Sequence, residues 1–309
     1  MLVSICVITY KRPQGLRRLL EGINQLSFTQ SSTPEVEVVV VDNDDQGLAN
    51  RICAEIEPRF RWQLKTGFEP KRGIAFARNK SIALASKNAD FIAIIDDDEV
   101  PDPSWLEDLL STAYKYNSDI VTGPVVPYFP HHNSSSWVVQ GNFFSAASYK
   151  TGEQRTVAFT HNVLVRASVL RKLNPVFNNR LALIGSSDAY LFMNLYKEGY
   201  KITWSNEAVV REWIPRSRTN LKWILLRGYR TWSDHSSFEK ELYPSLLVQS
   251  IRVLKGCALI LIGLLGLIPS LLMGKARIVR SLLFAFRGVG TLGGLLDLHY
   301  QEYKNVTQE

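Results

Sequence analysis

The stretch Phe91-Ile92-Ala93-Ile94-Ile95-Asp96-Asp97-Asp98-Glu99 joins five apolar residues directly to four acidic ones. A continuous apolar run of this length predicts a strand buried on both faces. Because a buried unpaired charge is costly, the strand is expected to end at Asp96, with the carboxylates at its C-terminal edge. Ligands of open parallel sheets bind outside that edge. Crowded carboxylate oxygens there suit Mg²⁺ or Mn²⁺, which can hold a diphosphate. The alternative interpretation is a solvated acidic turn.

The segments before this stretch alternate between strand and helix patterns. Apolar runs predict strands at Leu2–Thr9, Val36–Val41 and Phe60–Leu64, and helical spacing predicts helices from Pro13, over Ala49–Ile56, over Gly73–Ala85 and from Pro103 to Tyr116. This alternation predicts a Rossmann-like α/β fold with a mostly parallel sheet and right-handed crossovers. No GxGxxG follows the first strand, so the dinucleotide fingerprint is absent.

A second acidic strand end lies at Asp42, at the same expected edge of the sheet. The metal needs only the Asp96–Asp98 set, so Asp42 is free to accept hydrogen bonds from a nucleobase or ribose. Arg12, Arg72 and Arg78 can neutralise phosphate charge. Together these residues predict a site for a nucleoside diphosphate.

The pattern changes after Asp119. Strands are expected at Ile120–Val126, at Phe159–Val165 with Asn162 inside it, and at Tyr200–Trp204, and a helix is expected over Leu221–Trp232. The segment from Pro127 to Lys150 predicts a long loop or lid, in which His131 and His132 are loop residues without metal-ligand spacing. Gly185-Ser186-Ser187-Asp188 precedes a further helix, so helix capping is one interpretation of Asp188.

The C-terminal part is apolar and basic. Residues 256–274 carry no charge, and about 19 residues at ~1.5 Å each reach the thickness of a bilayer core. Cations flank this run on both sides, at Arg252, Lys255, Lys275 and Arg277. It therefore lacks the difference in positive charge between its two ends that a single membrane-spanning helix would show. We therefore expect a re-entrant or interfacial helical hairpin. A buried helical subdomain or an oligomer interface is the alternative. The net charge of +7, concentrated after residue 200, favours an anionic membrane over nucleic acid.

The motifs together resemble those of inverting family 2 glycosyltransferases with the GT-A fold, over about residues 1–232. The subgroup that they resemble makes bacterial exopolysaccharides and lipid-linked oligosaccharides, as in succinoglycan synthesis. The resemblance rests on Val-Ile-Thr-Tyr-Lys-Arg-Pro at 7–13, Val-Val-Val-Val-Asp-Asn at 38–43, Arg-Gly-Ile-Ala-Phe-Ala-Arg-Asn at 72–79, and Ile-Asp-Asp-Asp-Glu at 95–99 followed by Pro-Ser-Trp-Leu.

The resemblance implies a role for each matching position. On the donor side, it places Thr9, Tyr10 and Arg12 around the nucleotide, Asp42 on uracil, Arg78 near the nucleotide, Asp97 near the ribose, and Asp98 with Asp96 on the metal of a DXD-type motif. On the acceptor side, it makes Asp188 the general base and gives acceptor contacts to Glu212 and Arg216. Ser187 departs from the family pattern, which has a glutamate there.

The resemblance also implies the reaction and the organisation of the chain. It implies a GT-A domain at 1–232, with a nucleotide-binding half (1–117) and an acceptor half (118–232), and a membrane-associated region at 233–309. The expected reaction adds a single sugar from a UDP-sugar to a lipid-linked saccharide, with Mn²⁺ or Mg²⁺, at the cytoplasmic face of the membrane. Two alternatives remain at this stage: a nucleotidyltransferase, and a non-catalytic nucleotide-sugar binding or membrane scaffold protein, which Ser187 would suit.

Overall fold

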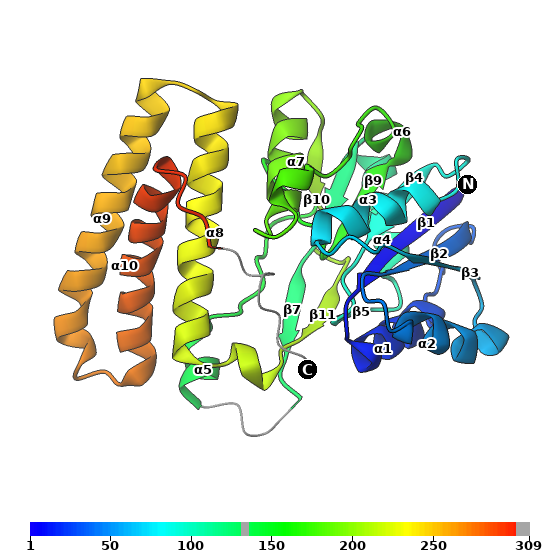
Figure 1. Cartoon of the computed structure of the whole chain (residues 1–309), viewed down its shortest axis with the longest axis horizontal. Helices are drawn as coiled ribbons and strands as arrows, with labels where there is room; N and C mark the ends of the chain where they lie inside the picture. Colours follow the sequence, from blue (N-terminus) through cyan, green and yellow to red (C-terminus); the bar gives the residue numbers. More distant parts are fainter. Residues whose placement is uncertain (131–135, 301–309) are drawn as a thin grey trace. The chain divides into compact units, whose positions relative to one another are not determined.

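The computed structural model describes residues 1–130 and 136–300. The chain forms two compact units, one from residues 1–128 and 146–213 and one within 129–145 and 214–301. The first contains the β-sheets, and the second is helical (Figure 1). Helix α8 (Leu221–Leu242) runs unbroken across residue 232, so the expected domain limit there does not coincide with the end of an element. The division into 1–232 and 233–309 stays a prediction.

Within the described residues, the larger sheet of the first unit has eight strands. Strand β9 is antiparallel to both of its neighbours and β8 is antiparallel to β10, whereas the other pairs are parallel. This confirms the predicted α/β fold with a mostly parallel sheet. The spatial order is β3 (Gln63–Phe68), β2 (Glu35–Asp42), β1 (Leu2–Thr9), β4 (Phe91–Ile94), β9 (Val163–Arg166), β6 (Ile120–Thr122), β10 (Ile202–Trp204) and β8 (Gln154–Arg155).

Helices cover both faces of this sheet, which explains the continuous apolar runs of its strands. On β1, Val3, Ile5 and Val7 face one core, while Cys6 faces the other. The first core includes residues of α1 (Pro13–Asn24), α2 (Leu48–Ile56) and α4 (Trp105–Lys115). The second core includes residues of α3 (Ile74–Leu84), α6 (Ala167–Leu170) and α7 (Ser187–Lys197).

A smaller sheet joins β5 (Glu99–Pro101), β11 (Val210–Trp213) and β7 (Val125–Tyr128). Strand β5 follows the acidic run directly and pairs antiparallel with β11. Sequence patterns missed β5 because three residues are too few for a period to be visible. The prediction of one strand over Ile120–Val126 was wrong, because the chain breaks at Gly123-Pro124 and places β6 and β7 in different sheets.

Three other boundaries differ from expectation. The third strand is Gln63–Phe68 rather than Phe60–Leu64, and the strand expected from Phe159 begins only at Val163. Helix α8 continues ten residues beyond Trp232, to Leu242. The expected long loop contains a short helix, α5 (Ser136–Gly141), whereas His131 and His132 lie outside the described residues.

Asn162 is fully buried just before β9 and has a partner for each side-chain group. Its Oδ1 accepts the indole N–H of Trp105 at 2.8 Å, and its Nδ2 donates to the carbonyl oxygens of Pro124 at 3.0 Å and Ala208 at 2.7 Å. These contacts connect α4, the break between β6 and β7, and the segment before β11. Asn162 therefore holds the two sheets of the first unit together.

Glu37 is buried on β2 and accepts hydrogen bonds from Ser4 Oγ, Lys65 Nζ and the Ser86 amide, each at 2.5 Å. Burial alone would raise the pKa of Glu37, but Lys65, Ser4 and Ser86 outweigh it and hold the pKa below its ordinary value of 4.5. A depressed folded-state pKa stabilises the fold above the unfolded pKa and loses that effect as the pH falls through the folded value.

We expect Glu37→Gln to destabilise the protein near neutral pH, because the amide keeps the shape but loses the charge that pairs with Lys65. The stability gap between wild type and variant should shrink below about pH 4.5, as wild-type Glu37 becomes protonated. Urea unfolding from pH 7 down to pH 3 measures this gap. A gap that stays constant with pH would contradict the ionised state of Glu37.

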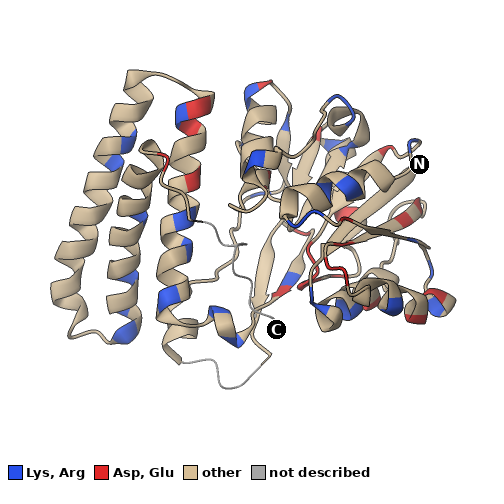
Figure 2. Cartoon of the chain, in the orientation of Figure 1, with Lys and Arg blue, Asp and Glu red and all other residues tan. Residues whose placement is uncertain are grey.

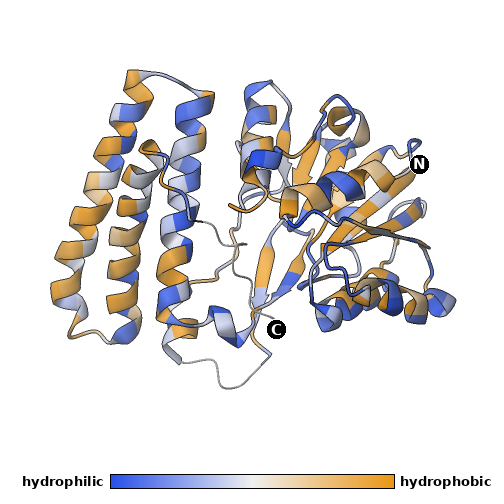
Figure 3. Cartoon of the chain, in the orientation of Figure 1, coloured by the Kyte–Doolittle hydropathy of each residue, from blue (hydrophilic) through white to orange (hydrophobic). Residues whose placement is uncertain are grey.

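The helical unit packs α8, α9 (Leu246–Ser270) and α10 (Lys275–Leu295) together, with α10 in contact with both others. Two helices of the described chain, α9 and α10, are long and apolar enough to cross a membrane by length and composition. Figure 3 shows α9 mostly apolar, with hydrophilic bands in its N-terminal part, whereas α8 contains several hydrophilic turns. The two apolar C-terminal helices that the sequence predicted are thus present.

Candidate active site

The strand register brings the acidic strand ends to one edge of the larger sheet. Thr9 at the end of β1 pairs with Asp42 at the end of β2, and Cys6 on β1 pairs with Ile94 on β4. Asp96, Asp97 and Asp98 follow β4 directly and so lie at the edge where Thr9 and Asp42 end. Figure 2 shows acidic residues in red on the segments beside α1 at this edge. The expected meeting of the two acidic sets is confirmed.

Asp97 is buried at the centre of this edge. Thr9 Oγ1 donates to its Oδ2 at 2.7 Å, and Arg12 Nη1 lies 3.1 Å from its Oδ1. The same Nη1 lies 2.9 Å from Asp98 Oδ2. The first turn of α1 comes close to this segment, since a Cβ on Gly15 would lie 2.5 Å from the Asp97 carbonyl oxygen. The backbone of the acidic run is therefore held from β1 and α1.

Burial and like charges raise the pKa values of two acids in this run. Burial raises the pKa of Asp97 to about 6, against the opposing charge of Arg12 and with added repulsion from Asp98 and Asp96. Burial, Asp96 and Asp98 raise the pKa of Glu99 well above its ordinary value, although the Asp96 amide donates to its Oε2 at 3.0 Å. Asp97 and Glu99 are also buried, so the run is not a fully solvated acidic turn.

Cationic side chains surround the acidic run. Arg78, buried on α3, places its Nη2 3.1 Å from Asp96 Oδ1. Above Tyr10, the Arg72 guanidinium lies 5.4 Å and the Lys11 ammonium 5.3 Å from the ring centroid. The mixture of carboxylates, cations and an aromatic ring suits a ligand with both a phosphate group and a planar ring.

Asp42 is more enclosed than the sequence suggested. It is 2 % exposed, and its Oδ1 and Oδ2 accept the amides of Asp44 at 3.0 Å and Ala49 at 3.1 Å. Burial raises the pKa of Asp42, and these two amides oppose that effect. Asp42 thus holds the loop before α2 and the start of that helix, although each oxygen retains a second lone pair.

Sequence reasoning missed the role of Asn43. Its Nδ2 donates to the carbonyl oxygens of Glu69 at 2.7 Å and Lys71 at 2.9 Å, and its Oδ1 accepts the Gly73 amide at 2.9 Å. Asn43 therefore fixes the loop that carries Arg72 over Tyr10. The only signal in the sequence was its place beside Asp42 in the matched motif.

Asp188 lies in the first turn of α7, where its Oδ2 accepts the amide of Thr160 at 3.2 Å and the hydroxyl of Thr160 at 3.1 Å. Strand β9 is antiparallel to β4 and pairs Val163 with Ile94, so β9 begins at the edge where β4 ends. Thr160 precedes the first residue of β9 by three positions and therefore brings Asp188 to the edge that carries Asp96–Asp98. Ser187 beside it is fully buried, and its Oγ has no hydrogen-bond partner among the described residues.

The two expected acceptor residues fall in different units. Glu212 on β11 lies opposite Glu99, and the next amide, of Trp213, donates to the Asp98 carbonyl oxygen at 2.7 Å. Glu212 is therefore close to the acidic run. Arg216 lies in the short helix Arg216–Arg218 and belongs to the helical unit.

A divalent cation fits the donor atoms of this edge. In residues 1–130 and 136–300, no group of three or more His, Cys, Asp or Glu side chains is arranged to hold a metal ion. However, Mg²⁺ in nucleotide enzymes is commonly held by one or two carboxylates together with substrate phosphates and water. Asp98 and Asp96 supply hard carboxylate oxygens of that kind, which a bound diphosphate would complete.

We expect the Thr160 hydroxyl to orient Asp188, so that Thr160→Val lowers the kcat of the reaction predicted at this edge by roughly tenfold while the KM of the nucleotide substrate stays unchanged. Thr160→Ser keeps the hydroxyl and should restore most of kcat. Steady-state kinetics of both variants, with melting curves to monitor folding, check this. Equal kcat values for Val and Ser would show that the hydroxyl has no such role.

The sequence matches two family descriptions, "Glycosyl transferase family 2" over residues 4–173 and "Glycosyl transferase family group 2" over residues 91–292. The first covers more than half of the chain and includes β1, β2, β4 and the acidic run. The chain belongs to glycosyltransferase family 2. The nucleotidyltransferase interpretation is thereby set aside.

Two relatives extend the comparison. The succinoglycan biosynthesis protein ExoM of Rhizobium meliloti is 30 % identical over 234 residues, which cover 75 % of this chain and 74 % of ExoM. The glucosyl-dolichyl phosphate glucuronosyltransferase of Haloferax volcanii is 25 % identical over 99 % of this chain and its own whole length.

Solved structures share the fold at low identity. The mannosyltransferase PcManGT of Pyrobaculum calidifontis, in complex with GDP-Man and Mn²⁺, superposes with a TM-score of 0.62 at 18 % identity, over 96 % of this chain and 87 % of PcManGT. S. aureus TarS 1-349, in complex with UDP-GlcNAc, superposes with a TM-score of 0.54 at 16 % identity. The match covers 96 % of this chain and 92 % of the TarS chain. The GT-A-like fold expected from the resemblance is confirmed.

Proposed function

We propose that this protein transfers a single sugar from a UDP-sugar, with inversion at the anomeric carbon, to a lipid-linked saccharide. The observation that supports the proposal is the shared sheet edge, where Thr9 and Asp97 lie and toward which Thr160 holds Asp188. The similarity to a succinoglycan biosynthesis protein and to a dolichyl phosphate glycosyltransferase supports the class of acceptor.

The proposed chemistry is one direct displacement. The acceptor hydroxyl oxygen attacks the anomeric carbon, the bond from that carbon to the UDP oxygen breaks, and Asp188 takes the hydroxyl proton. The carboxylate of Asp188 accepts hydrogen bonds from Thr160 and from the Ala189 amide at 2.8 Å, and so keeps a fixed direction. An α-linked donor then gives a β-linked product.

The donor side is assigned to the residues around the acidic run. Tyr10 offers its ring to the nucleoside, Asp42 contacts the base, and Asp97 lies near the ribose. Arg12 and Arg78, now paired with the aspartates, balance the charge of the diphosphate. A Mn²⁺ or Mg²⁺ ion on Asp98 and Asp96 would stabilise the departing UDP as a Lewis acid. PcManGT, which shares the fold, was solved with Mn²⁺ and supports this assignment.

The acceptor is proposed to reach the site from the cytoplasmic face of a membrane, to which α9 and α10 attach the protein. Glu212 beside the acidic run, and Arg216 in the helical unit, are proposed to contact its saccharide. The apolar composition of the two helices supports attachment.

The test is UDP release from a panel of UDP-sugars by protein in lipid or detergent, with Mn²⁺ or with EDTA. We expect release with one sugar, which EDTA abolishes and Mn²⁺ restores. A lipid extract as acceptor should increase the rate. Release that EDTA leaves unchanged would reject the metal assignment.

UDP binding without release for any sugar, in the presence of the lipid extract, would favour a nucleotide-sugar binding protein instead. Ser187 is the observation that favours such a binding protein. It replaces the family glutamate, and its hydroxyl has no hydrogen-bond partner among the described residues. Absence of UDP binding, measured by calorimetry, would reject the nucleotide assignment itself.

A further inference from the structure

Helix α9 contacts its neighbours through a narrow stripe of residues. Its buried positions are Arg252, Gly256, Gly263 and Ser270, which recur at spacings of four and seven and so lie on one side of the helix. The backbones of α9 and α10 approach closely there, since a Cβ on Gly288 of α10 would lie 2.5 Å from the Gly256 carbonyl oxygen. The Ser270 and Ser281 hydroxyls lie 2.9 Å apart across the same contact.

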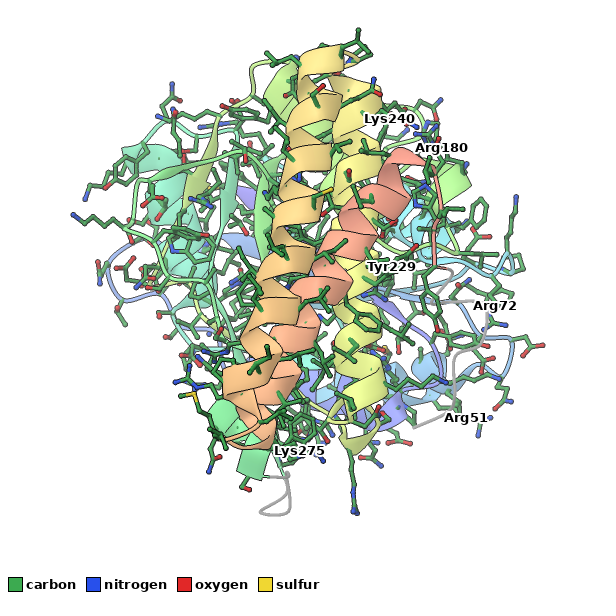
Figure 4. All side chains as sticks on the ribbon, turned by 90° about the vertical axis from the view of Figure 1, so that its left-hand side faces the viewer. Arg51, Arg72, Arg180, Tyr229, Lys240 and Lys275 are labelled. Atoms are coloured by element: carbon green, nitrogen blue, oxygen red, sulfur yellow. The ribbon has the colours of Figure 1, made fainter. Side chains whose placement is uncertain are left out.

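The opposite side of α9 is exposed, apolar and free of charge. Exposure reaches 83 % at Leu246 and 93 % at Leu272, and Figure 4 looks onto this side of the helix. Arg252 is turned into the bundle, where it pairs with Glu239 of α8, so it does not interrupt the surface. The apolar surface therefore extends back beyond the uncharged run to Leu246. Its most exposed members are Leu246, Leu247, Leu254, Ile268, Leu271 and Leu272.

Helix α8 opposes insertion of this hairpin across the bilayer. It packs along α10 from Gly228, which meets Leu283, to Ser233, which meets Gly294. Along its length α8 carries charged side chains that are not buried, at Arg227, Arg230, Lys240 and Glu241. If α9 and α10 stood upright in the hydrocarbon, α8 would enter with them, at a cost of a few kcal/mol for each charge near the centre.

We infer that α9 lies flat in the surface of an anionic membrane, with α10 and α8 stacked above it. This inference rests on the membrane attachment proposed above. It adds the orientation of α9 and so favours an interfacial helix over a spanning or a re-entrant one.

Charge supports an anionic bilayer as the occupant of this surface. Exposed cations flank the uncharged run, with Lys255 directly before it and Lys275 and Arg277 just after it. Figure 4 shows Lys275 and Lys240 at opposite ends of the helical bundle. A helix inserted tip first would carry Lys275 and Arg277 into the hydrocarbon, whereas a flat helix keeps both ends at the headgroups.

The native cysteines offer a direct test, because Cys257 is exposed on α9 while Cys6 and Cys53 are buried. A fluorophore would be attached to Cys257, and to Leu264→Cys and Leu272→Cys in a Cys257→Ser background. Its depth would be measured by quenching lipids in phosphatidylglycerol–phosphatidylcholine vesicles. Thr231→Cys, exposed on α8, is the matched control expected to remain in water.

We expect the labels at positions 257, 264 and 272 to lie at one shallow depth, about 5–10 Å below the headgroups. A re-entrant or spanning helix would instead separate Cys257 from residue 272 by about 22 Å, and such a gradient would overturn the inference. Protein that does not float with vesicles but forms dimers through Cys257 would overturn it too, by assigning the surface to a second copy. Sugar transfer in detergent tests the proposed activity separately.

Discussion

Asp188→Asn is expected to lower the kcat of sugar transfer by about 10²–10⁴-fold, the usual contribution of a positioned general base. The amide has nearly the same shape and can still accept the Thr160 hydroxyl hydrogen bond, so the fold and the site geometry should remain. It cannot take the proton of the acceptor hydroxyl. The measurement is the rate of transfer with saturating donor, together with UDP binding by calorimetry, which should be unchanged.

Asp90→Asn is the matched control for this substitution. Asp90 precedes β4 at the opposite edge of the sheet and accepts the Leu2 amide at 2.8 Å. Its variant should transfer sugar at the wild-type rate. If Asp188→Asn did the same, Asp188 would only be a residue in the first turn of α7, and the base would have to be found elsewhere.

Asn162→Leu is expected to destabilise the protein by about 3–5 kcal/mol, because three buried polar groups each lose a hydrogen bond, although the Pro124 carbonyl oxygen keeps the Val210 amide as a partner. Leucine is similar in volume but cannot accept the Trp105 indole N–H or donate to the Pro124 and Ala208 carbonyl oxygens. The loss should be largest for the smaller sheet, which these contacts tie to β6 and α4. Urea unfolding, followed by tryptophan fluorescence, measures the change.

The control for Asn162→Leu is Asn88→Leu at an exposed position, where a change within about 0.5 kcal/mol is expected. An Asn162→Leu protein as stable as wild type would mean that water replaces the lost partners, and that Asn162 does not join the sheets.

Much of the donor half could be predicted from sequence because its signals are local. The apolar run before Asp96 and the valines before Asp42 define strands buried on both faces, and parallel connection places their ends together. The alternation of strands and helices also predicted α1, α2, α3 and α4 to within a few residues. The C-terminal apolar helices were visible from composition alone.

The acceptor half depended on contacts between segments far apart in the chain, which no local period reveals. Only the antiparallel pairing of β9 with β4 brings Thr160, and through it Asp188, to the acidic edge. Only the pairing of β5 with β11 places Glu212 opposite Glu99.

The sequence by itself determined the alternation of buried strands and helices, the acids at one sheet edge and the apolar tail, because each follows from side-chain chemistry within a short segment. The tertiary structure decided which residues hold those groups. Asn162 is an ordinary amide in the sequence, and the burial that makes it a junction between sheets comes from partners distant in the chain. Likewise, the charge of Arg252 interrupts α9 in the sequence but not on its surface, because Glu239 of a neighbouring helix turns it inward.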